Sequence, residues 1–230
     1  LGVRELLPIA YYRMSVVDDG QSLKDVAKGH RNMATLINVD RSRQPFAPGR
    51  IGSSLRLGGP KRGVYANVSS GLELSASEFT IMAWVWAKTF PKNAILVSDM
   101  NLPGIETFRF GFIGNHGHLG LVLSNGEQFL QIVDSSPLSQ EEWVHVAVVK
   151  SAEGLRLHKN GELVSSTPLN GFQCQQFKPS LIGGLPKKSG DKKRDSRSGF
   201  WHGRIDELAF FGSALTREQI ENLFNLTPSI

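Results

Sequence analysis

Two adjacent acidic residues, Asp206 and Glu207, stand inside an otherwise apolar strand pattern, GRIDELAFF. A retaining glycoside hydrolase needs two carboxyl groups about 5 Å apart on one side of the sugar. Neighbouring residues on a regular strand point to opposite faces, so this pair is not expected to work together. No second acidic residue follows on the strand at two or four positions. The sequence therefore predicts no catalytic residue and no enzyme.

Two histidines, His116 and His118, would share one face if their segment is a strand, and together they could hold a metal ion. The alternative is that they are ordinary loop or strand-edge residues, because no carboxylate is close to them in the sequence. The chain contains neither a G-x-S-x-G nor an H-E-x-x-H pattern. The single cysteine, Cys174, excludes an internal disulfide and has no local sign of an activated thiol.

Tryptophan side chains are the next candidates for ligand contact. Trp84 and Trp86 alternate with core-type residues in SEFTIMAWVWAK, so they lie on one strand face. There they either stack on the sugar rings of a ligand or pack between layers of the protein. Trp86 is the candidate that we name, together with Trp201, which follows a strongly basic segment.

That basic segment, residues 187–197, holds six basic and two acidic residues, among them Lys192, Lys193 and Arg194. The whole chain has a net charge of +5, and outside this segment 20 basic residues face 19 acidic ones. A nucleic-acid-binding domain would carry a wider basic patch interleaved with aromatic residues, so no nucleic-acid partner is expected. The segment is either a solvated insertion or a loop that contacts anions through those three residues.

Strand patterns dominate the elements that position these residues. The clearest strands are 77–88 and 142–150, with shorter ones at 10–14, 54–57, 64–68, 94–98, 107–113 and 203–211. Two Asn-Gly pairs, Asn125-Gly126 and Asn160-Gly161, predict hairpins with type I′ turns. Residues 18–50 read as a long connection with one helical turn near 23–27. This pattern predicts an antiparallel sandwich.

A short helix is predicted directly after the last strand. Thr216 at the N-cap and Gln219 three residues later form a capping box, and Leu215 and Ile220 form a hydrophobic staple around it. No apolar run approaches the roughly 20 residues that a membrane span needs. The chain begins without a signal peptide or an initiating Met, which suggests a fragment of a longer protein.

Six motifs in order across residues 9–224 resemble laminin-G-like, or concanavalin A-like, domains: IAYYRM, GRIGSSLRLGG, FTIMAWV, WVHVAVV, the NG hairpin with IGG, and GRIDELAFFGSALTREQI. The resemblance implies an all-β fold, a two-sheet antiparallel jelly-roll sandwich of about 12–14 strands with a short C-terminal helix. We expect a single domain over residues 1–230, with its core at about 9–224.

The same resemblance implies a non-catalytic recognition module of a larger extracytoplasmic protein, binding carbohydrate or a protein partner. Relatives occur attached to enzymes, adhesins and FecR-type transmembrane regulators of signalling. The alternatives are a glycoside hydrolase of the glucanase type and a spacer domain without a ligand. Converging aromatic and polar groups on an open face would favour binding.

Calcium is the one cofactor that the resemblance implies. In related jelly rolls a structural Ca²⁺ joins the first strand to the last, with an Asp near the last strand supplying the carboxylate. Here that residue is Asp206, with carbonyl oxygens from Ile9 and Ala10 and from Gly58 or Gly59. The alternative is that Asp206 accepts hydrogen bonds from backbone amides or pairs with Arg204.

Overall fold

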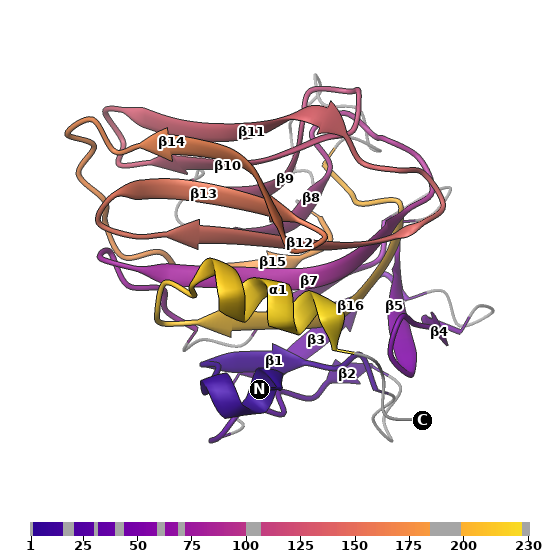
Figure 1. Ribbon diagram of the computed structural model, residues 1–230. Coiled ribbons are helices and arrows are strands. Elements are labelled where there is room, and N and C mark those ends of the chain that lie inside the picture. Colours follow the sequence, from indigo (N-terminus) through magenta and orange to yellow (C-terminus); the bar gives the residue numbers. More distant parts are fainter. Residues whose placement is uncertain are drawn as a thin grey trace.

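The computed structural model describes residues 2–15, 21–29, 32–39, 44–58, 63–68, 72–99, 107–184 and 199–226. Within these ranges, two antiparallel sheets stack face to face (Figure 1). Sheet A runs in the order β14 (Glu162–Pro168), β13 (Gly154–Lys159), β12 (Trp143–Lys150), β7 (Phe79–Ala87), β16 (Gly203–Phe211), β5 (Ser53–Leu57) and β4 (Phe46–Pro48), and β1 (Ala10–Tyr12) also pairs with β16. Sheet B runs in the order β11 (Phe129–Pro137), β10 (His118–Ser124), β9 (Phe108–Ile113), β8 (Ile95–Asp99), β15 (Pro179–Ile182), β6 (Tyr65–Val68), β3 (Ala34–Ile37) and β2 (Ser22–Leu23). This arrangement confirms the predicted two-sheet sandwich.

The core lies between the two sheets and is rich in phenylalanine. Phe79 of sheet A makes edge contacts with Phe108 of sheet B and with Phe177, at ring-centre distances of 6.1 and 6.2 Å. The alternation read in 77–88 is confirmed, since Phe79 and Ile81 belong to this core while Met82 packs on the opposite face of sheet A. We call that opposite face the outer face.

Helix α1 (Arg217–Asn225) lies across part of the outer face, beside β7 and β16 (Figure 1). Its start confirms the predicted capping box, because the Thr216 side chain accepts from Gln219 N at 3.2 Å and the Gln219 side chain accepts from Thr216 N at 2.8 Å. Ile220 and Leu223 are buried against the sheet, which gives the helix its apolar face. A short 3-10 helix, η1 (Val3–Leu6), precedes the first strand.

Both predicted Asn-Gly hairpins are present, but only one has the predicted turn. Asn160 and Gly161 have φ of 51° and 83°, as a type I′ turn requires. Asn125 does not have a positive φ. Its side-chain oxygen instead accepts hydrogen bonds from the backbone N–H groups of Glu127 and Gln128, at 3.0 and 2.8 Å. The first hairpin is therefore closed by a longer, Asn-centred loop.

Residues 18–50 differ most from the prediction. In place of a helical turn at 23–27, the described part forms the short strands β2, β3 and β4. The buried carboxylate of Asp25 organises this region, accepting from the backbone N–H groups of Tyr11, Ala27 and Asn32 at 2.9–3.1 Å. These tertiary hydrogen bonds replace the local hydrogen bonds of a helix. With β2, β3 and β4 included, the described residues form sixteen strands rather than the predicted 12–14 or so.

Among the described residues, no helix is both long and apolar enough to cross a bilayer.

Candidate ligand-binding site

A row of four side chains crosses the outer face of sheet A beyond the end of helix α1. Strand pairing places Trp143 opposite Trp86, Trp86 opposite Arg204, and Arg204 opposite Arg56. Directly opposed residues share a face, so the four side chains project from β12, β7, β16 and β5 on the same side. We call these four residues the Trp–Arg row.

Arginine stacking on tryptophan shapes the Trp–Arg row. The guanidinium carbon of Arg204 lies 4.2 Å from the centre of the Trp86 ring and 5.4 Å from that of Trp143. Arg204 also donates from Nη1 to the carbonyl oxygen of Pro48 at 3.1 Å, which fixes the plane of the guanidinium. Trp143, Trp86 and Arg204 are half-buried and Arg56 is exposed, so the row is partly open to solvent.

The electrostatics of the row are unbalanced toward positive charge. Burial, and to a lesser extent the neighbouring charge of Arg56, lower the pKa of Arg204 from its usual value. Among the described residues, neither arginine forms an ion pair with a carboxylate. Two cations side by side without a carboxylate are a ready site for an anion.

Trp84 sits one step along the same face and is only 4% exposed. Its indole contacts the ring of His145 at 5.3 Å and that of Phe224, on helix α1, at 5.7 Å. The guanidinium carbon of Arg50 lies 4.9 Å from its centre. The two tryptophans of this strand thus take different roles, because helix α1 covers Trp84 and leaves Trp86 open.

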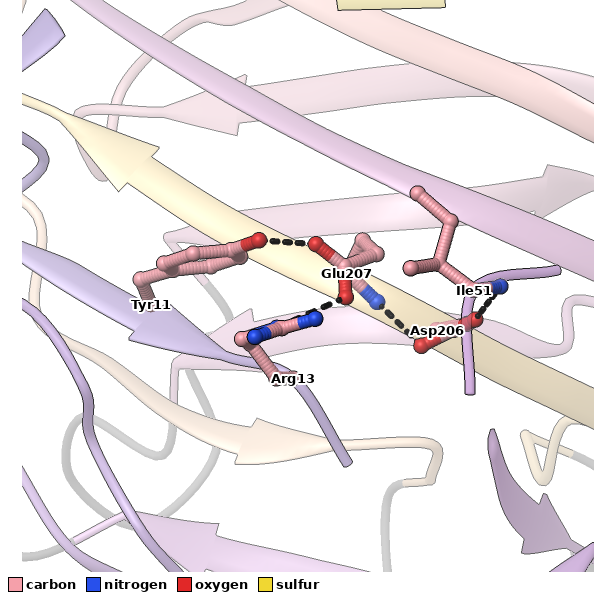
Figure 2. Close-up of polar contacts among 5 residues, drawn as sticks. All are labelled: Tyr11, Arg13, Ile51, Asp206 and Glu207. Carbon is pink, nitrogen blue, oxygen red and sulfur yellow. Dashed lines mark hydrogen bonds and ion pairs between the residues drawn. The ribbon is translucent and has the colours of Figure 1, made fainter. Parts of the chain in front are cut away.

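The acidic pair on β16 does not follow the predicted alternation. The register of β16 against β7 shifts between Asp206 and Ala209, and Glu207 has a φ of 50°, as in a β-bulge. Asp206 lies opposite Trp84 on the outer face, and Glu207 turns to Tyr11 and Arg13 (Figure 2). The expectation that the two carboxylates point to opposite faces is therefore wrong, because the bulge adds a residue to the strand.

Internal hydrogen bonds nevertheless occupy both carboxylates, which are 0% and 3% exposed. Asp206 accepts from the backbone N–H of Ile51 at 2.9 Å and from that of Glu207 at 2.8 Å (Figure 2). Gly49 permits this approach, since a Cβ there would lie 2.5 Å from Asp206 Oδ2. Glu207 accepts from the Tyr11 hydroxyl and pairs with Arg13 Nε at 3.3 Å. The pair holds β1 and the 49–52 turn against β16.

Burial raises the pKa of Asp206 to about 7, and the charge of Glu207 adds to this, while the hydrogen bonds from Ile51 and Glu207 oppose it. Burial also raises the pKa of Tyr11, and the charge of Glu207 acts in the same direction. Both shifts reflect removal from water at the join between β1, β16 and the 49–52 turn.

The surroundings of Asp206 do not fit the predicted calcium site. Backbone N–H groups, rather than carbonyl oxygens, meet its carboxylate. Ile9 and Ala10 pair with Phe210 instead, and Gly58 packs against Trp201 and His202. The described part of the chain contains no group of three or more His, Cys, Asp and Glu residues that could hold a metal ion.

The two histidines proposed for a shared metal site do not lie on one strand face. His116 is exposed in the turn before β10, whereas His118 begins β10 and its Nδ1 lies 2.9 Å from the carbonyl oxygen of Asp134. His118 and the turn that holds His116 belong to the β9–β10 hairpin of sheet B, on a different layer from the Trp–Arg row. Lys192, Lys193 and Arg194 lie outside the described residues.

The structure does not support the prediction that Trp201 contacts a ligand. Its side chain is 0% exposed and stacks on Phe112 of sheet B with ring centres 4.4 Å apart. A side chain sealed between the sheets cannot meet a ligand at the surface. The residues that replace it as candidates are Trp143, Arg204 and Arg56, which sequence reasoning missed because only cross-strand register brings them beside Trp86.

Known structures share this architecture at low sequence identity. Domain 4 of AbnA, a GH43 extracellular arabinanase from Geobacillus stearothermophilus solved with arabinotriose, matches 95% of this chain and 98% of its own, with a TM-score of 0.68 and 18% identity. The binding domain of botulinum neurotoxin serotype C1 matches with a TM-score of 0.69 and 18% identity, and that of Paraclostridial Mosquitocidal Protein 1 with 0.65 and 18%. Each covers 95% of this chain, which spans about half, 52%, of either toxin domain.

Sequence comparison gives a family assignment independently of the structure. No curated protein matches the chain significantly. The Laminin_G_3 family model, described as the concanavalin A-like lectin/glucanases superfamily, matches residues 60–221. This match covers most of the chain and includes every strand of the Trp–Arg row except β5. The chain therefore belongs to the concanavalin A-like lectin/glucanases superfamily.

Proposed function

We propose that this domain is a non-catalytic recognition module that binds carbohydrate through the Trp–Arg row on the outer face of sheet A. The observation that carries the proposal is the stack of Arg204 on the half-exposed Trp86, with Trp143 beside it. Indole rings offer an apolar surface to the C–H faces of a sugar, and the guanidinium offers hydrogen-bond donors to its oxygens. A spacer domain without a ligand does not require indole rings and guanidinium groups that are accessible to solvent.

Carbohydrate is a better fit than a protein partner for this face. A stable protein interface covers about 800 Å² on each partner, which is more than four side chains supply. The large hydrophobic side chains that are exposed in the described residues, Leu7, Met33, Phe129 and Leu163, lie on different elements and away from the row. The binding domain of botulinum neurotoxin DC, of which this chain spans about half, 51%, was solved with SialylT and, separately, with rat synaptotagmin II.

The carboxylates of β16 support a non-catalytic role. A glycosidase acid and its partner must reach the scissile bond, whereas Asp206 and Glu207 are buried and bonded to Ile51, Tyr11 and Arg13. We therefore propose binding without hydrolysis. We further propose that the domain acts as part of a larger extracytoplasmic protein, where extracellular glycans are accessible.

A glycan array tests the proposal, using the domain and its Trp86→Ala/Trp143→Ala variant. We expect glycan signals from the domain that the variant loses, and a rise in melting temperature with the same glycans. The control is Phe129→Ala, which removes a 75% exposed aromatic ring from sheet B and should leave the signals unchanged. Signals that survive in the double variant, or binding of a protein in their place, would overturn the proposal. Release of reducing sugar from a bound glycan would show an enzyme instead.

A further inference from the structure

We propose that the ligand of this face is an acidic saccharide, whose carboxylate or sulfate group binds between Arg204 and Arg56. The inference rests on the proposed carbohydrate-binding function and adds the chemical class of the sugar. It starts from the opposition of Arg204 on β16 and Arg56 on β5, two strands whose register places the cations side by side on the outer face. Repulsion between like charges directly across a sheet is unfavourable unless something relieves it.

Protein groups relieve this repulsion only in part. Arg204 donates to the Pro48 carbonyl oxygen, a neutral acceptor, at 3.1 Å. The nearest carboxylate on the same strand face, Asp206, is buried and turned to the backbone of Ile51 and Glu207. In the described part of the chain no carboxylate pairs with either arginine. An anion from outside would supply the missing charge.

Charge is distributed unevenly along the Trp–Arg row. The two arginines lie at one end of the row, on β16 and β5. The exposed acidic residues Glu141 and Glu142 instead precede Trp143, two strands away from Arg204. The row therefore has a cationic end at β16 and β5 and an aromatic end at β12 and β7.

This polarity matches the shape of an acidic sugar. A carboxylate can accept two parallel N–H bonds from one guanidinium group. Stacking on Trp86 holds the guanidinium group of Arg204 in a fixed plane, ready to donate such bonds. The sugar ring attached to the carboxylate would then extend toward Trp143, where an indole is half-exposed. An acidic peptide offers the same charge but lacks the flat C–H face that suits the tryptophans, so we assign the site to saccharides.

The test compares matched acidic and neutral glycans, such as a sialylated glycan with its asialo form and a uronate oligosaccharide with its neutral counterpart. Affinities are measured by calorimetry for the domain, for Arg56→Gln and for the control Arg4→Gln. Both substitutions remove one exposed arginine, the first in the row and the second on η1. We expect the domain to prefer the acidic member by about ten-fold, a preference that Arg56→Gln reduces and Arg4→Gln retains.

The possible results distinguish failure of the acidic specificity from failure of the proposed carbohydrate binding. Equal affinity for both members would overturn the acidic specificity. An undiminished preference in Arg56→Gln would overturn the placement of the acidic group between the two arginines. Either result would leave carbohydrate binding intact. Failure to bind any glycan would overturn the proposed function as well. Competition by octaglutamate as strong as that by the acidic glycan would reassign the site to acidic peptides. A preference that weakens between 50 and 500 mM NaCl more steeply when Arg56 is present would support the inference.

Discussion

The guanidinium of Arg204 stacks on the indole of Trp86 across the join between β16 and β7, with its central carbon 4.2 Å from the ring centre. The stack orders a flexible cation at a surface position, so less side-chain freedom is lost when a ligand binds. Gly203 allows the two strands to approach, since a Cβ there would lie 1.9 Å from the Trp86 carbonyl oxygen. The position of the Arg204–Trp86 stack therefore depends on the close pairing of β16 with β7.

Replacing Arg204 with lysine keeps the charge but removes the planar fork. We expect Arg204→Lys to weaken glycan affinity about ten-fold, because lysine cannot form two parallel bonds to a carboxylate while stacked on an indole. Calorimetry measures the affinity, and a thermal melt checks that the fold is intact. Arg217→Lys, an exposed change on helix α1, is the matched control. An Arg204→Lys affinity equal to that of the unchanged domain would contradict the role of the stack.

Two buried groups that flank Trp84 across neighbouring strands, Asp206 and His145, give opposite pH dependence of stability. The pKa of Asp206 is raised to about 7 in the folded chain, above its unfolded value of about 3.9. Its stabilising contribution is therefore full below pH 3.9 and is lost as the pH rises toward 7. Burial lowers the pKa of His145 to about 3, so its contribution is full above pH 6.5 and is lost as the pH falls to 3.

Between about pH 4 and 6.5 these two contributions oppose each other, and single variants should separate them. In His145→Leu, the free energy of unfolding should fall with rising pH relative to the unchanged domain, by up to about 1.4 kcal/mol per pH unit. In Asp206→Asn it should rise with pH by a similar slope. Urea denaturation in steps from pH 4 to 8 measures both. Slopes that match the unchanged domain in both variants would show that neither group titrates as described.

Trp201 should behave as a core residue and not as a ligand contact. Trp201→Phe removes part of its stack on Phe112, and we expect a loss of about 1–3 kcal/mol in the free energy of unfolding because a cavity remains between the sheets. Glycan affinity of the folded variant should be unchanged. Denaturant melts and calorimetry on the same preparation check both. A loss of affinity without a loss of stability would place Trp201 in the site.

The capping box of helix α1 predicts a local loss of stability. Thr216→Ala removes the acceptor of the Gln219 N–H, which should cost about 1 kcal/mol. Hydrogen exchange should then speed up at the first turn of the helix, while amides of sheet B keep their protection. Thr216→Ser, which retains the hydroxyl, is the control. Equal exchange in both variants would mean that the box does not hold the helix start.

Local signals explain which parts of this fold could be predicted from sequence. Three predicted elements depend only on residues that are close in the sequence, and all three are confirmed: the strand at 77–88, the Asn160-Gly161 turn and the Thr216 cap. The strands within 18–50 could not be read, because they are stabilised by Asp25 reaching the backbone of distant segments, including Tyr11. A β-bulge leaves little sequence signature, so the turning of Glu207 was missed.

In the candidate site, too, local features could be predicted from sequence and features that depend on distant residues could not. Alternation along one strand was enough to place Trp84 and Trp86 on one face, which in the structure is the outer face of sheet A. It could not tell Trp86 from Trp84, because the difference is made by Phe224 of helix α1, which lies far along the chain. Nor could it bring Arg204 and Arg56 to Trp86, since three strands distant in sequence meet only in the sheet.

The most direct test of the central claim is a crystal structure of the domain with the glycan that gives the strongest array signal. The account predicts electron density for the sugar over Trp86 and Trp143, with an acidic group within hydrogen-bonding distance of Arg204. Density for the glycan on sheet B, or at the turns that join the strands, would contradict it.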